Sequence, residues 1–195
     1  MLTVLQLMGV TLTALLAENF ILVNCLGIGT RTQAFCNPLD AWRTGFSLTV
    51  VMTLTAVLGW GLNLLLRHFA LSYYQTLVFA LLGPAVVGAL RYALKNCVPE
   101  LSRRMDANLA SITSNCAAMG TALLVAQRSY GIGEAFLYGL FGGLGATIAL
   151  MSFAGLRGEV SLKHCPKCFQ GMPIELITAG LMALSLVGFY GLHLV

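Results

Sequence analysis

Two cysteines lie in the same short phrase, which occurs once in each half of the chain. The phrase is Asn-Cys with Gly-Thr four residues after the cysteine, and it places Cys25 and Cys116 in matching positions. The copies are 91 residues apart in a chain of 195 residues, and both lie in apolar segments. Cysteine thiolates are soft ligands that bind iron–sulfur clusters and other soft metals. The repeat therefore predicts two related halves and a redox centre between them.

Small and polar residues flank both cysteines. They are Gly27 and Gly29 after Cys25, and Ser111, Thr113 and Ser114 before Cys116. Such residues let a helix break and satisfy the freed backbone groups inside a membrane. The alternative is ordinary helix packing, in which a free cysteine acts as a small apolar residue.

The composition places the chain in a membrane. Hydrophobic residues make up 58% of it and charged residues 9%, with a mean hydropathy of +0.85. Soluble domains carry about 25% charged residues. Because apolar segments fill nearly the whole chain, we expect no soluble domain. The net charge of +4 lies in the connections and does not indicate nucleic-acid binding.

Six apolar stretches are long enough to span, given about 20 residues per crossing. They are Leu2–Leu26, Gly45–Leu66, Tyr74–Leu94, Leu109–Ala126, Gly133–Leu156 and Pro173–Leu192. The turn residues and charges fall between them, at 37–40, 67–68, 96–106, 128–131 and 157–171. We expect an all-α integral membrane protein forming a single domain.

The placement of Lys and Arg predicts the orientation. The odd-numbered connections and the adjoining end of the third span carry nine of these residues, and the even-numbered ones carry only Arg67 and Arg128. Positive charges favour the cytoplasmic side, so both termini should face outward. With three spans in each half, residues 97–195 are then an inverted repeat of residues 1–96, and the broken first and fourth helices meet at the midplane.

Longer strings resemble a known family. They are Ser114-Asn115-Cys116-Ala117, the run from Ile177 to Met182, and Glu18-Asn19-Phe20 in the first span. They look like the A subunit of the Rnf ion-translocating oxidoreductase and like its homologue, the E subunit of the sodium-pumping NADH:quinone reductase. The outward termini match the A subunit of Rnf, because its paralogue in that complex, the E subunit, is expected to have the opposite topology.

The resemblance implies a heterodimer of inverted paralogues in the bacterial inner membrane. Each paralogue would give two cysteines, here Cys25 and Cys116, to one [2Fe–2S] cluster, which needs four ligands. The cluster would carry electrons across a hydrocarbon core of about 30 Å. The other partners implied are membrane lipid and the B, C, D and G subunits, which bear flavin and iron–sulfur centres. The chain would be part of a ferredoxin:NAD oxidoreductase without being catalytic alone.

The first cysteine departs from the family pattern. The family places it in a Leu-Gly-x-Cys string, which here ends in Gly29, so that Cys25 lies one helical turn earlier. Residues four apart share a helix face, displaced by about 5.4 Å. The internal repeat instead pairs Cys25 directly with Cys116. We expect Cys25 to replace the family ligand; otherwise the cluster is altered or absent.

Two further features have competing interpretations. Glu18 is the one carboxylate deep in a span, which suggests an ion or proton relay or a neutral residue fixing the first helix against the fourth. Cys165 and Cys168 form a C-x-x-C string that needs a second pair, such as Cys36 and Cys97, to hold a metal. In a reducing cytosol these cysteines are otherwise free thiols.

A non-redox interpretation also stays open. A six-helix transporter with inverted repeats would account for the glycines and for Glu18. It would not account for a cysteine at both repeat positions.

Overall fold

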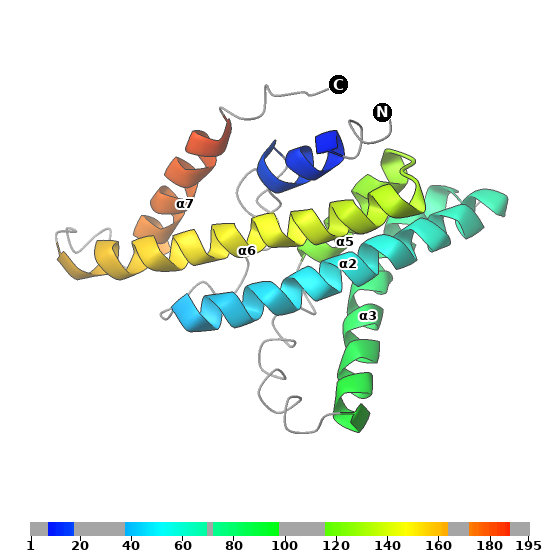
Figure 1. Ribbon diagram of the computed structural model, residues 1–195, viewed down its shortest axis with the longest axis horizontal. Coiled ribbons are helices and arrows are strands. Elements are labelled where there is room, and N and C mark those ends of the chain that lie inside the picture. Colours follow the sequence, from blue (N-terminus) through cyan, green and yellow to red (C-terminus); the bar gives the residue numbers. More distant parts are fainter. Residues whose placement is uncertain (1–7, 18–37, 70–71, 98–115, 164–171, 188–195) are drawn as a thin grey trace.

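The computed structural model describes residues 8–17, 38–69, 72–97, 116–163 and 172–187, and all of its elements are helical. They are the π-helix η1 (Thr13–Ala17), α2 (Pro38–His68), the short 3-10 helix η3 (Ser72–Tyr74), α3 (Gln75–Cys97), α5 (Cys116–Gln127), α6 (Ile132–Lys163) and α7 (Met172–Val187) (Figure 1). Within these residues α2, α3 and α6 are long and apolar enough to cross a membrane. Shorter apolar helices cover Cys116–Gln127 and Leu176–Ser185. The expectation of an all-α protein with membrane-spanning helices is confirmed at this level.

Several predicted boundaries were wrong, because helices extend past their apolar runs. The first connection was placed at 37–40, but Pro38 begins α2 and Asp40 lies in its first turn. Proline suits the first helical position because its missing N–H has no partner there anyway. Arg67 and His68 end α2, Asn96 lies within α3, and α6 continues from Leu156 to Lys163. Arg67, Arg157, Glu159 and Lys163 at these ends are residue types with good helix propensity, so an apolar helix that has begun can continue through them.

The long helices α2 and α6 lie side by side and run in opposite directions (Figure 1). Their contact is close because glycines face the other helix. A β-carbon added at Gly143 would lie 2.6 Å from Cα of Thr49, and one added at Gly139 would lie 2.9 Å from Cα of Thr53. Small residues let membrane helices approach in this way, since lipid supplies no hydrophobic force between them.

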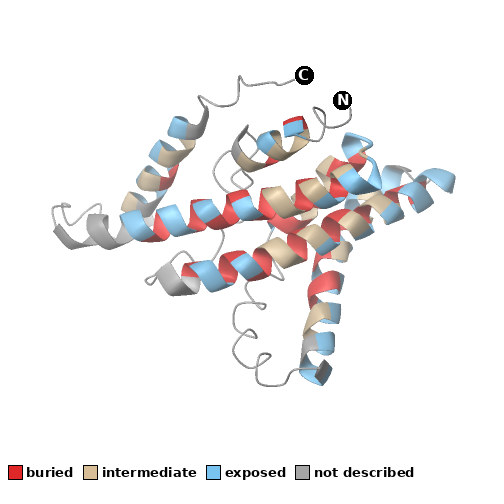
Figure 2. Cartoon of the chain, in the orientation of Figure 1, coloured by how far each residue is buried: buried red, intermediate tan, exposed pale blue. Residues whose placement is uncertain are grey.

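Buried residues follow the contact between these helices. Figure 2 shows them along the facing sides of α2 and α6 and at the adjoining part of α3. The largest fully buried side chains are those of Tyr138, Phe79, Leu48 and Met52. Many exposed positions on the outer faces are large and apolar, for example Leu58 in α2 and Leu81 in α3, as expected for surfaces that meet lipid.

Helix α5 runs in the same direction as α2. Gly59 of α2 faces Ala122, and Arg67 at the end of α2 donates from Nη2 to Ser129 Oγ at 2.8 Å, just beyond the end of α5. The same nitrogen lies 3.5 Å from the Ala126 carbonyl oxygen, one of the carbonyls that a helix end leaves without an internal partner. The connections after α2 and after α5 therefore lie at one end of the molecule.

Candidate functional site

Cys116 is the first residue of α5 and its thiol is exposed and free. The next two residues point the other way: Ala117 and Ala118 are fully buried or nearly so. This change from exposed to buried occurs because the helix turns by about 100° per residue. The thiol is thus presented at the surface by a helix whose opposite side is packed.

The inner side of α5 is fixed by close contacts with small residues. A β-carbon at Gly59 of α2 would lie 2.9 Å from Cβ of Ala122. Thr121 is fully buried, and its hydroxyl donates to the carbonyl of Ala118 at 2.8 Å. Because alanine has no side-chain freedom to lose, this packing of the middle of α5 against α2 has a low entropic cost.

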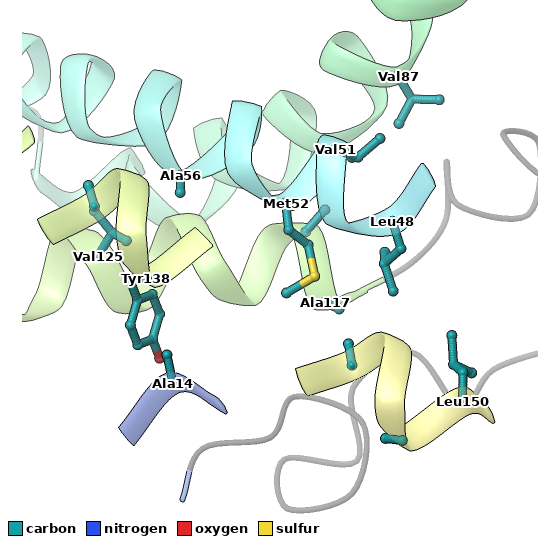
Figure 3. Packing of buried hydrophobic residues seen from close by; sticks show 14 residues of the cluster. Ala14, Leu48, Val51, Met52, Ala56, Val87, Ala117, Val125, Tyr138 and Leu150 are labelled. Atoms are coloured by element: carbon teal, nitrogen blue, oxygen red, sulfur yellow. The ribbon is translucent and has the colours of Figure 1, made fainter. Parts of the chain in front are cut away.

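The start of α5 lies well inside the apolar length of α2. Ala117 belongs to one cluster of buried residues with Leu48, Val51 and Met52 of α2, and Figure 3 shows it beside Met52. The apolar part of α2 covers Ala41–His68. Cys116, next to Ala117, is therefore presented alongside the membrane-spanning part of α2.

Most other predicted site residues lie outside the described ranges. These are Cys25, Gly29, Glu18, Cys36, Cys165 and Cys168. Cys97 is the last residue of α3, and its side chain is not described. The predicted helix breaks near Gly27 and before Cys116 also fall outside these ranges. Within the described part of the chain, no three His, Cys, Asp or Glu side chains come together as a metal site.

The first span has an unusual backbone in its described part. Residues 8–12 are α-helical, and Thr13–Ala17 then form the π-helix η1, ending one residue before Glu18. Single π-turns within helices occur frequently at functional sites. η1 packs against α6, where a β-carbon at Gly145 would lie 2.7 Å from the Leu15 carbonyl oxygen.

Glu134 caps a helix. Its carboxylate accepts a hydrogen bond of 2.9 Å from the N–H of Gly131, the residue before α6. This is the position from which an acidic side chain reaches back to the helix start. The contact agrees with the interfacial position that its place at the segment end implies.

Sequence reasoning missed a pair of threonines. Thr49 in α2 and Thr147 in α6 have their hydroxyl oxygens 3.1 Å apart. Each follows a glycine by four residues, Gly45 and Gly143, and the two Gly-x-x-x-Thr strings are 98 residues apart. This spacing of 98 residues could be found in the sequence alone, as could the 91-residue spacing of the two cysteines.

Comparison with known proteins gives one consistent result. The family model described as Rnf-Nqr subunit, membrane protein, matches residues 7–193. A protein of Syntrophotalea carbinolica, named as the A subunit of an ion-translocating oxidoreductase complex, is 35% identical over 96% of this chain and 97% of its own length. The A subunit of the Na⁺-translocating ferredoxin:NAD⁺ oxidoreductase complex of Acetobacterium woodii is 33% identical over 97% of this chain and 100% of its own. A counterpart from Azoarcus sp., named like the first, is 36% identical over 91% of this chain and 92% of its own.

Proposed function

Because the chain belongs to the Rnf-Nqr family of membrane subunits, we propose that it is the A subunit of an Rnf-type ion-translocating oxidoreductase complex. The observation that carries this proposal is the full-length match to relatives bearing that name. The relatives described above carry the A-subunit name and not that of the quinone-reductase subunit, which favours the Rnf branch. The chain would act within the complex and would not be catalytic alone.

Within that complex we propose that Cys116 is a ligand of a [2Fe–2S] cluster, together with Cys25. The described residues fit such a group: an exposed, free thiol is presented at the start of α5 beside the apolar part of α2. A cluster of this type has four ligands, and we propose that the other thiolates come from Cys25 and from another chain, the paralogous E subunit. When bound, the cluster would accept and release single electrons. The protein's part is to hold the thiols in place and to exclude water around them.

Two related halves would explain why the ligands come in pairs. The middle helices of the proposed repeats, α2 and α6, are antiparallel and contact each other through matching Gly-x-x-x-Thr strings. An inverted repeat requires an antiparallel relation between equivalent helices. The proposed repeats, residues 1–96 and 97–195, therefore agree with the packing seen between α2 and α6. A role for Glu18 in moving the coupled ion is part of the same proposal.

The proposed topology predicts the location of reporter fusions. A reporter fused at Val195 should score outside and one fused at Leu162 inside, because positive charges concentrate on the odd-numbered connections. Reporters inserted after Phe69 and after Ser129 should score on the same side as Val195, since Arg67 bonds Ser129 at that end. Full reversal would identify the opposite paralogue. Opposite scores for Phe69 and Ser129 would contradict the helix arrangement itself.

Metal analysis tests the cluster directly. The purified complex should contain iron and acid-labile sulfide beyond the amount held by the other subunits, with a matching EPR signal. Changing Cys165 and Cys168 to Ser should leave iron, zinc and the electron-transfer rate unchanged, because the C-x-x-C string lacks a second pair of ligands. This double variant is the control for nonspecific effects of removing thiols. A loss of metal from it would show instead that these two cysteines hold a further metal site.

A further inference from the structure

The hydroxyl groups of Thr49 and Thr147 meet at the closest part of the contact between α2 and α6. Their oxygens are 3.1 Å apart, within hydrogen-bond distance. Thr147 is 3% exposed and Thr49 is half-buried. Two oxygens this close in an apolar setting need a proton between them, because facing lone pairs would be unfavourable.

The two threonines have similar surroundings. A β-carbon at Gly45 would lie 2.5 Å from Cγ2 of Thr147, and a β-carbon at Gly143 would lie 2.9 Å from Cγ2 of Thr49. Each threonine thus fits over the glycine of the opposite helix. The two contacts differ in their nearest atom, which is a side-chain atom of Thr147 at Gly45 and the backbone Cα of Thr49 at Gly143.

The Thr49–Thr147 hydrogen bond between the helices can be exchanged for a hydrogen bond within one helix. Thr49 Oγ1 also lies 2.9 Å from the Gly45 carbonyl oxygen, and Thr147 Oγ1 lies 2.9 Å from the Gly143 carbonyl oxygen. Each hydroxyl has one proton, so two protons serve three contacts. When one threonine donates to the other, the glycine carbonyl on its own helix loses its hydroxyl donor. When the helices part, that hydroxyl donates to this carbonyl again, and the other hydroxyl keeps its bond to its own helix.

We propose that the α2–α6 contact is a joint at which the two halves of the chain move against each other. Close packing of glycine against threonine sets the register, and the Thr49–Thr147 bond can open with no net loss of a hydrogen bond. The hydrogen bond between the helices therefore costs little free energy to break, whereas the packing of glycine against threonine fixes which residues face each other. Membrane interhelical hydrogen bonds are worth little for the same reason, since the separated helices also find partners.

The first test removes the hydroxyls and keeps the shape. Thr49→Val, Thr147→Val and the double variant of the full chain should each shift Tm by no more than about 2 °C, because the bond is replaced within each helix on separation. Thr55→Val is the matched control, since its fully buried hydroxyl bonds only the Val51 carbonyl of its own helix. If the Tm of either single variant fell by about 5 °C or more beyond the fall seen for Thr55→Val, the hydrogen bond would be holding the two helices together, and the proposal would be overturned.

The second test links α2 and α6 covalently so that they cannot move against each other. Its readout is turnover of the complex, so this test rests on the function proposed above. In the assembled complex, Thr49→Cys with Thr147→Cys should form a disulfide on oxidation. Turnover should then fall at least tenfold and return with dithiothreitol. Each single cysteine variant, oxidised in the same way, controls for damage to the native thiols. Full turnover of the crosslinked complex would refute the joint, whereas a wild-type complex without electron transfer would refute the proposed function instead.

Discussion

Cys116→Ser is expected to abolish one iron–sulfur EPR signal of the purified complex and the electron transfer that depends on it. A serine oxygen is a poor substitute for a thiolate, because clusters of this type require soft ligands. Electron input at the cytoplasmic side should continue, since it takes place in other subunits. EPR, iron analysis and separate assays of the two half-reactions measure this outcome.

The fold should survive the change. Cys116 is exposed and free, and substitutions at such sites usually change the free energy of unfolding by less than about 0.5 kcal/mol. An unchanged Tm with a lost signal would therefore identify a ligand and not a folding defect. A full cluster signal in the Cys116→Ser complex would refute the redox proposal for this chain.

The same assay decides the identity of the second ligand. Cys25→Ser should reproduce the loss if the internal repeat pairs Cys25 with Cys116. If the family string is the better guide, Cys25→Ser should have little effect. The double variant Cys25→Ser with Gly29→Cys places a thiol one turn later, where the Leu-Gly-x-Cys string of the family has its cysteine. Recovery of the EPR signal in this variant would show that a thiol at that position can act as the ligand.

Gly143→Ala is expected to destabilise the folded chain by about 2 kcal/mol, the middle of the usual range for overpacking. The added β-carbon would lie 2.6 Å from Cα of Thr49. A backbone atom cannot rotate away, so α2 and α6 must separate and lose contacts along their length. Alanine favours helix over glycine by about 1 kcal/mol, which offsets part of this cost. Thermal unfolding followed by the fluorescence of Trp42 and Trp60 measures the result.

Gly155→Ala is the matched control in the same helix. A β-carbon there meets no atom of the described residues within 4 Å, so Tm should stay the same or rise. Gly45→Ala provides a second comparison, because its obstacle is the Thr147 side chain. Thr147→Ala should restore part of the stability lost in Gly45→Ala, whereas Thr49→Ala should not rescue Gly143→Ala. Equal behaviour of the Gly143 and Gly155 variants would contradict the close contact.

The membrane helices could be predicted from the sequence, because their length and apolar character follow from the thickness of the bilayer. The apolar cores of α2, α3 and α6 fall where the spans were expected. Their ends could not be predicted from hydropathy, because hydrogen bonding and terminal residues decide where a helix stops. Pro38 and Lys163 show this, since both belong to helices although they lie outside the apolar runs.

The candidate site was predictable in part. The repeated phrase around Cys25 and Cys116 suggested ligands, and the structure shows Cys116 exposed at the start of α5. The contact of Thr49 with Thr147 was not predicted, because single threonines and glycines are common in spans and their partners depend on tertiary packing. The Gly-x-x-x-Thr spacing gave only a partial signal, because Gly9 and Thr13 form a third string of the same kind.

The length of the two central helices has a consequence for binding at the surface. α2 begins seven residues before its predicted apolar run at Gly45, and α6 continues seven residues beyond Leu156. The helices are antiparallel and Gly45 faces Thr147, so the start of α2 lies level with α6 just before Leu156. The last turns of α6 therefore continue past the start of α2 by about 13 Å, at 1.5 Å per residue. A water-soluble partner arriving at this end would meet an ordered helix end. Since association must otherwise supply the free energy to order such a segment, the end of α6 is preorganised for binding.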